Sequence, residues 1–235
     1  MLRQALVTLI VVLAAWSSTV SAQSSPADGR GRLRDRYDKP RQQQKLDDAI
    51  RKFGEEDTPT RLEGVEGLGE NAEDAKAVDY LLRGASDADP SVRIKSIDVI
   101  GDARVKAAVP LLAQQLFMRD TTPGMKQHIL GALGKIGDTR ATKPILDFLA
   151  RDIDPAMRGS AVFALGDIGD RAALPTLEKL AKQSTDENFR GLAQSAIRKI
   201  EQRPPPTVVP PALAKERRPR SPDATGPGAD ENTTP

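Results

Sequence analysis

Side chains that could do chemistry are few in this sequence. Its 235 residues include one histidine, His128, and no cysteine. Thiolate metal sites, disulfides and cysteine nucleophiles are therefore impossible, and a histidine metal site or a Ser–His–Asp triad would depend on His128 alone. The sequence therefore predicts no catalytic residue, no metal site and no bound cofactor.

A basic residue recurs through the middle of the chain. After six intervening residues it is followed by an apolar residue and then, in four of five cases, by glycine. The five basic residues are spaced 32, 33, 32 and 32 residues apart: Arg61, Arg93, Lys126, Arg158 and Arg190. They could form a basic strip on a groove wall. The favoured interpretation is a structural ladder, in which they pair with acidic turn residues such as Asp89 or Asp154.

Helical hairpins must position this column. An Asp/Pro turn precedes each of the first four basic residues, and Asp caps helices well while Pro suits a first helical turn. Apolar residues at helical spacing follow the basic residue, and a second helix starts near Pro110, Pro144 and Pro175. A period of about 32 residues is typical of stacked repeats. We therefore predict an all-α fold, an α-solenoid of about five helical-hairpin repeats over residues 46–202.

The same repeat predicts a binding surface. If the helix that carries the basic residue lines a groove, the first, second and fifth positions after that residue point outward. Candidate protein-binding residues are Ile94, Lys95, Asp98, Gln127, His128, Ser160, Phe163 and Leu192. Phe163 would be a large exposed ring that makes an apolar contact patch with Ile94 and Leu192. Partial burial of Phe163 against the last repeat is the alternative.

Three Gly-Asp pairs recur near the helix ends, at 101–102, 137–138 and 169–170. Recurring Asp residues can indicate metal binding. We interpret these pairs instead as turns in which Gly supplies a left-handed backbone and Asp caps the next segment.

Two segments of the repeat region resemble a known family. MRGSAVFALGDIGDRAALPTLEKLAK (157–182) and MKQHILGALGKIGDTRATKPILDFLA (125–150) look like HEAT-like repeats of the bilin-lyase (PBS lyase) type. Residues 92–116 keep the frame, but Arg104 stands where the others have Gly137 and Gly169. The resemblance spans roughly 46–202 and implies the solenoid fold. It does not fix a function, because this repeat serves many unrelated roles.

Families with similar repeats include enzymes, and the sequence can be compared with the motifs that those enzymes use. Deoxyhypusine hydroxylases, which resemble these repeats, bind iron through paired His-Glu motifs, and such motifs are absent here. By analogy to bilin lyases, a lyase or isomerase activity on a tetrapyrrole remains an alternative function.

Both ends of the chain differ from the middle. Residues 1–22 have one Arg, a twelve-residue apolar run and a small-x-small end, which together predict a secretory signal peptide, with an uncleaved anchor as the alternative. Residues 23–45 predict a disordered basic linker, with seven Lys/Arg against three Asp from Asp28 to Lys45. Residues 203–235 contain nine prolines and predict a disordered tail.

These features together predict an exported scaffold. We expect cleavage near Ala22/Gln23, a periplasmic or extracellular location, a monomer that binds one or more protein partners, and no enzymatic activity. Polyanion binding by the basic linker is a further alternative. Nucleic acid is not an expected partner, because the net charge is only +2 and the chain carries an export signal. Membrane contact is expected only through an uncleaved signal.

Overall fold

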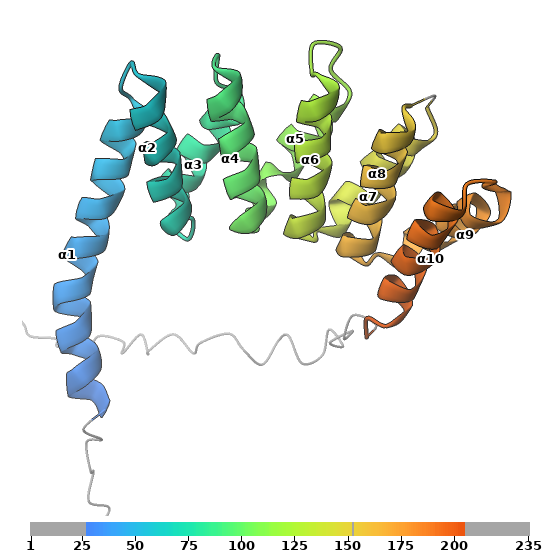
Figure 1. Cartoon of the computed structure of the whole chain (residues 1–235). Helices are drawn as coiled ribbons and strands as arrows, with labels where there is room; N and C mark the ends of the chain where they lie inside the picture. The colour runs from blue at the N-terminus through green and yellow to red at the C-terminus, as the bar shows by residue number, and fades with distance from the viewer. Residues whose placement is uncertain (1–26, 152, 205–235) are drawn as a thin grey trace, which may run out of the picture. The chain divides into compact units, whose positions relative to one another are not determined.

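The structure is a computed structural model that describes residues 27–151 and 153–204, with side chains from Lys39 onward (Figure 1). The predicted signal peptide and nearly all of the predicted tail lie outside these residues. The described residues form ten α-helices and three short 3₁₀ turns, and the predicted all-α solenoid class is confirmed. The helices are α1 (Ala27–Phe53), α2 (Thr58–Glu70), α3 (Ala75–Gly84), α4 (Pro90–Asp102), α5 (Val109–Leu116), α6 (Pro123–Ile136), α7 (Thr142–Leu149), α8 (Pro155–Ile168), α9 (Leu174–Gln183) and α10 (Glu187–Glu201).

The helices form five successive hairpins. We call the odd-numbered member of each hairpin the A helix and the even-numbered member, which carries the recurring basic residue, the B helix. The chain divides into two compact units, Met1–Val99 and Ile100–Pro235, each described by itself, and the division falls inside α4. In the second unit α6 packs on α8 and α8 on α10, so that the B helices form one layer with the A helices behind them (Figure 1).

The sequence marks where the B helices begin. The side chains of Asp57, Thr122, Asp154 and Asp186 each accept a hydrogen bond from a backbone N–H of the first turn of α2, α6, α8 and α10. Pro lies at the start of α2, α6 and α8. A cap of this kind stabilises a helix by about 1 kcal/mol, and the fixed φ of Pro suits the first turn.

Glycine in the B helices permits close packing between repeats. A Cβ atom on Gly134 would lie 3.1 Å from Ala164 Cα, and one on Gly166 would lie 3.0 Å from Ala196 Cα. Each glycine therefore faces the alanine of the next B helix, where a larger side chain would force the helices apart. Arg198 takes the glycine position in α10, the last B helix that the structure describes.

Two of the three Gly-Asp pairs form the turns that the sequence predicts. Gly137 and Gly169 have φ of 67° and 75°, and Asp138 and Asp170 cap the 3₁₀ turns η2 (Thr139–Ala141) and η3 (Arg171–Ala173). The interpretation is wrong for Gly101, which lies inside α4, where its added Cβ would come within 2.8 Å of Ala132 Cα.

Arg104 takes the left-handed role in that repeat. Its φ is 53°, and it is the one non-glycine residue with positive φ among the described residues. An ordinary side chain costs about 1 kcal/mol in this conformation, so that the third hairpin is entered through a mildly strained link.

Apolar side chains make a separate core in each unit. Leu68, Leu81 and Ile97 are fully buried in the first unit, and the second buries Leu112, Leu133, Ile145, Leu165 and Ile168. The third residue after each basic residue is buried in all five repeats: Gly64, Ser96, Ile129, Ala161 and Ala193. Small side chains at four of these positions let the paired helices approach closely.

The predicted disordered linker differs from the structure. Helix α1 begins at Ala27, and only residues 23–26 of the predicted linker lie outside the described residues. Few apolar residues suggested disorder, but Arg, Lys, Gln and Leu are good helix formers. Leu46 and Ala49 at its end are buried where α1 packs on α2, so that the helix is anchored by its last turns.

Among residues 27–151 and 153–204, every helix is too short or too polar to span a membrane.

Candidate functional site

The predicted groove residues all lie on B helices. Ile94, Lys95 and Asp98 are half-buried on α4 in the first unit. Lys95 Nζ forms an ion pair with Glu66 Oε1 of α2, so the charge of Lys95 is used inside the unit. Gln127, His128, Ser160, Phe163 and Leu192 belong to the second unit, on α6, α8 and α10. Of the predicted apolar patch, Ile94 therefore belongs to the first unit, and Phe163 and Leu192 belong to the second.

Phe163 is the most prominent of these side chains. It is 55% exposed, and the only other large exposed apolar side chain of the described residues is Met118, at 41%. Met118 follows α5 in a turn, whereas Phe163 lies in the middle of α8. Phe163 is therefore more than half exposed, as its predicted outward orientation requires, while Lys199 of α10, in the last repeat, lies over its ring.

The other predicted groove residues of the second unit are one apolar and three polar side chains. Leu192 is half-buried, and its Cδ2 lies 3.6 Å from where a Cβ on Gly159 would be, which places Leu192 against α8. Ser160 Oγ donates to Ala156 O at 3.1 Å, so its hydroxyl is satisfied within the helix. Gln127 is exposed and His128 is half-buried on α6.

A lysine that the sequence reasoning missed completes the patch. Lys199 Nζ lies 5.5 Å from the centre of the Phe163 ring and also forms an ion pair with Asp167 Oδ1. Asp167 lies one turn after Phe163 on α8, so the exposed ring is held beside a Lys–Asp pair that joins α8 to α10. We call Phe163, Leu192 and Lys199 the Phe163 patch.

A repeat signal could have revealed this pair. From α4 onward the charge of the ninth residue after the basic residue alternates in sign, with Asp102, Lys135, Asp167 and Lys199, whereas α2 carries Glu70 at this position. Lys135 Nζ lies 2.6 Å from Asp102 Oδ1, which is the same pairing one repeat pair earlier. Alternating charge at a fixed repeat position indicates ion pairs between successive B helices.

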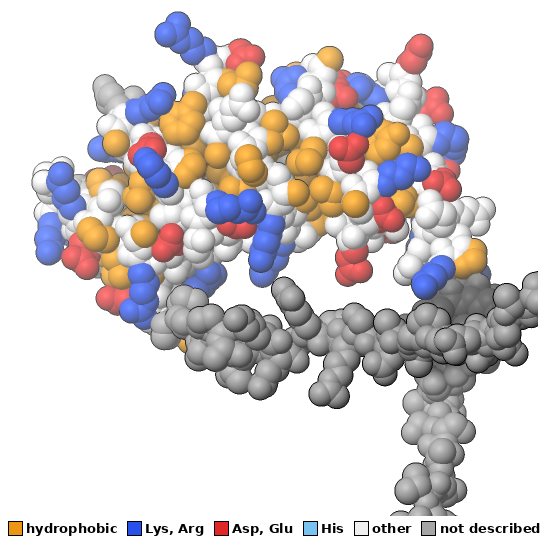
Figure 2. Space-filling model, turned by 180° about the vertical axis from the view of Figure 1, so that it is seen from behind, with side chains coloured by type: hydrophobic (Ala, Val, Ile, Leu, Met, Phe, Trp, Pro, Cys, Tyr) orange, Lys and Arg blue, Asp and Glu red, His pale blue; other side chains and the backbone are white. Residues whose placement is uncertain are grey.

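The A helices of the second unit face the other way. Figure 2 views that side, where hydrophobic side chains lie among Lys, Arg, Asp and Glu. The largest exposed ring of the described residues is therefore a feature of the B-helix layer, where the sequence predicted the binding surface.

The predicted ladder residues make different contacts from one repeat to the next. Arg61 pairs with Asp87, with Nη1 at 2.9–3.0 Å from both carboxylate oxygens, and its Nη2 lies 3.8 Å from Asp89. Arg93 donates instead to the carbonyl oxygens of Asp87 and Ala88. An acidic partner is thus found at Arg61, whereas Arg93 binds the backbone of its own turn.

The remaining members of the column lie in the second unit. Lys126 Nζ lies 5.9 Å from the centre of the Phe148 ring, and Arg190 donates to Ser184 O at 3.1 Å. The Arg158 side chain is exposed, and its guanidinium has no hydrogen bond or ion pair with a described residue. Asp154, a predicted partner, caps α8.

In the turn between α3 and α4, the carboxylate of Asp89 accepts short hydrogen bonds. Thr58 Oγ1 donates to Asp89 Oδ2 at 2.7 Å, and Ser91 N donates to Asp89 Oδ1 at 2.7 Å. These bonds favour the carboxylate, so the pKa of Asp89 lies below its usual value, with the Thr58 bond as the main cause. Elsewhere Arg140 holds the pKa of Asp138 at about 2.

No group of three or more His, Asp or Glu side chains that could hold a metal ion occurs within residues 39–151 and 153–204.

Comparisons with known proteins agree with the repeat fold. Residues 114–198 match the family model described as HEAT repeats, so the chain contains HEAT-like repeats. None of the curated proteins matches this sequence. Among solved structures, the chain is similar to an engineered protein from the Northeast Structural Genomics Consortium, with 20% identity and a TM-score of 0.48. That match covers 66% of this chain and 79% of the engineered one.

Proposed function

We propose that the chain is an exported, non-catalytic HEAT-repeat scaffold that binds a protein partner through the Phe163 patch. Export is supported by the signal pattern of residues 1–22, and the absence of catalytic activity by the lack of Cys and the single His. The PBS lyase subtype and the tetrapyrrole alternative have no support beyond the resemblance of the repeats.

The observation that carries this proposal is the exposure of Phe163. The Phe163 ring is 55% exposed, so much of its apolar surface remains in water. Each Å² of apolar surface that stays in water forgoes about 25 cal/mol of stabilising free energy. A partner that covers this ring recovers that free energy. Lys199 Nζ lies 5.5 Å from the ring centre, and half-buried Leu192 lies on the same helix, α10. Aromatic residues are enriched at protein interfaces.

The experiment is site-specific photocrosslinking in the native envelope. A photoreactive residue at Ser195, which is exposed and lies on the same face of α10 as Leu192 and Lys199, reports what lies nearby. We expect one defined protein to be crosslinked, and we expect Phe163→Asp to reduce its yield by at least tenfold, because an aromatic anchor commonly contributes about 2 kcal/mol or more.

Met118→Asp is the matched control, since it places the same charge on the other large exposed apolar residue of the described chain. Equal loss of the crosslink in both variants, or loss in neither, would show that the Phe163 patch is not the binding surface. Circular dichroism should show both variants folded, because the replaced side chains are exposed.

A further inference from the structure

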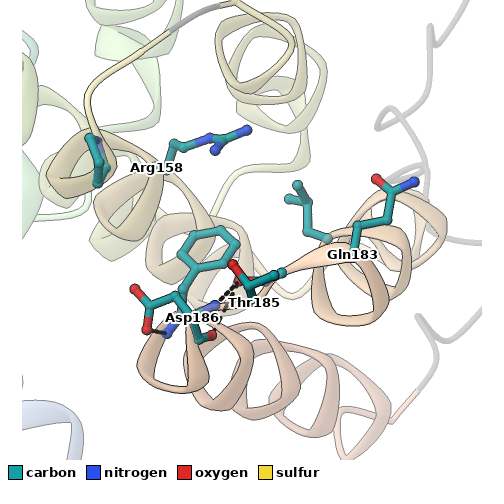
Figure 3. A pocket seen from close by; sticks show the side chains of 8 residues that line it. Arg158, Gln183, Thr185 and Asp186 are labelled. Atoms are coloured by element: carbon teal, nitrogen blue, oxygen red, sulfur yellow. Dashed lines mark hydrogen bonds between the residues drawn. The ribbon is translucent and has the colours of Figure 1, made fainter.

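The turn between α9 and α10 contains an open pocket of about 350 Å³. Its apolar part is formed by Leu180 and Phe189, and its polar part by Arg158, Gln183, Thr185 and Asp186. Figure 3 shows Arg158 on α8 at one side of the pocket, with Gln183, Thr185 and Asp186 at the other side. A volume near the small end of known ligand pockets fits one or two side chains.

The first unit contains the same turn in a closed form. Asp87 lies 26 residues after Arg61, and Ser184 lies 26 residues after Arg158. In the first unit the Asp87 carboxylate accepts from Arg61 Nη1 and also from Asp89 N, at 2.8 Å. In the second unit Ser184 Oγ accepts from Asp186 N at 3.1 Å, so Ser184 reproduces only the backbone bond.

The remaining hydrogen bonds of the two turns match. Arg93 donates to Asp87 O and Arg190 donates to Ser184 O, in each case six residues along the chain. Asp89 Oδ1 accepts from Ser91 N, and Asp186 Oδ1 accepts from Asn188 N. The backbone therefore holds both turns in the same way, and the difference is the carboxylate at the first position.

The carboxylate that Asp87 supplies to Arg61, and that Ser184 does not supply to Arg158, indicates what the pocket would bind. Arg158 has lost the partner that Arg61 has, and a guanidinium binds carboxylates through strong charge-assisted hydrogen bonds. We propose that this pocket binds the carboxylate of a peptide, which takes the place that Asp87 occupies at Arg61, with an adjacent apolar side chain resting on Leu180 and Phe189. The carboxylate comes from an acidic side chain or from a chain terminus.

Asp186 does not prevent this binding. Its Oδ1 accepts two backbone N–H bonds from the first turn of α10, and the partial positive charge of a helix N-terminus offsets its charge. The first unit shows the same arrangement occupied, because Asp87 and Asp89 both lie within 4 Å of the Arg61 guanidinium.

The test is NMR titration of the full chain with three peptides: acetyl-Ala-Leu-Glu-amide, acetyl-Ala-Ala-Leu with a free carboxylate, and acetyl-Ala-Leu-Gln-amide. We expect at least one acidic peptide to bind with a dissociation constant in the millimolar range or below, shifting the amide signals of Asp186 and Phe189. The neutral peptide should bind at least tenfold more weakly. The tighter of the two acidic peptides identifies whether the source is a side chain or a terminus.

Variants separate the pocket from general attraction of charge. Arg158→Met should weaken binding at least tenfold, while Arg171→Met, at an exposed arginine in η3, should leave it unchanged. Ser184→Asp should weaken binding to the same extent by supplying the carboxylate from within. Gln194→Asp, with the same added charge on α10, should not.

The proposal is wrong if Arg158→Met or Ser184→Asp changes the affinity less than twofold, or if the neutral peptide binds equally well. It is also wrong if Asp152→Asn raises the affinity more than fivefold, because Asp152 would then be an internal partner of Arg158. Phe163→Asp should leave peptide binding intact, so the outcome is independent of the function proposed above.

Discussion

The turn before α4 and the turn before α10 have the same backbone and different charge. Arg61 and Asp87 form an ion pair with side chains only 19% and 13% exposed, whereas Arg158 stands exposed beside Ser184. The hydrogen bonds that define the turn are kept in both. The comparison shows that different atoms set the backbone of the turn and the contacts of its basic residue, so that one turn can be closed by an ion pair while the other is left open.

Removing the arginine of each turn should produce the largest difference in the free energy of unfolding between the two units. Arg61→Met should lower the free energy of unfolding of the first unit by about 2 kcal/mol, because it leaves the Asp87 carboxylate largely buried without its partner. Arg158→Met should change that of the second unit by less than about 0.5 kcal/mol, as for most exposed side chains. Urea unfolding followed by circular dichroism, with hydrogen exchange in α2 and in α8 to locate the effect, measures both. Equal losses would refute the closed and open assignment.

Removing the acid rather than the base should have a smaller effect. Asp87→Ser makes the first turn a copy of the second, and we expect a loss of about 1–2 kcal/mol in urea unfolding. The loss is smaller because Ser retains an acceptor for Asp89 N and because the Asp89 carboxylate, 3.8 Å from Arg61 Nη2, remains as a partner. A loss larger than that of Arg61→Met would show that Asp87 acts mainly through the backbone.

The reverse exchange should stabilise the protein. Ser184→Asp gives Arg158 a carboxylate at the position of Asp87, and we expect a gain of about 0.5–1 kcal/mol, the range of partly exposed ion pairs. A double-mutant cycle with Arg158→Met measures the coupling of the two residues. The gain should vanish in the Arg158→Met background, and a gain that persists there would mean that the added Asp acts only as a cap.

Much of the fold could be predicted from the spacing of the repeats. A basic residue every 32 or 33 residues, with Asp/Pro turns before it, located the starts of α2, α4, α6 and α8 within a residue or two. Helix α1 was missed before residue 46, because few apolar residues were taken to mean disorder. Helix propensity acts without apolar residues, and burial of Leu46 and Ala49 suffices to anchor the helix.

The candidate site could be predicted only in part. Helical periodicity places Phe163 outward, since its position relative to Arg158 follows from 100° per residue. The sequence does not reveal whether an arginine pairs with an acidic side chain or with the carbonyls of its own turn, because both lie within reach of a long side chain. Arg61 and Arg93 make these opposite choices. The meaning of Ser184 becomes visible only when the structure shows what Asp87 does at the equivalent place.

The smallest expected effect is that of removing the Thr58 hydroxyl, which has no counterpart in the turn before α10. Pro155 stands where Thr58 does relative to the basic residue, so the second turn lacks the bond from Thr58 Oγ1 to Asp89. Thr58→Ala should raise the pKa of Asp89 toward its ordinary value, measured by carbon NMR titration of the carboxyl group. Thr60→Ala is the control: it should raise the pKa of Asp57, which the Thr60 hydrogen bonds lower, and leave Asp89 unchanged.

The sign of the accompanying pH dependence follows from that pKa. A carboxyl group whose pKa is lowered on folding stabilises the folded state at pH above the unfolded-state pKa, and this contribution is lost as the pH falls through the folded-state value. The difference in stability between the native chain and Thr58→Ala should therefore be full at neutral pH and shrink below about pH 4. A difference that stays constant down to pH 2 would mean that Thr58 stabilises the turn by packing rather than by favouring the ionised form of Asp89.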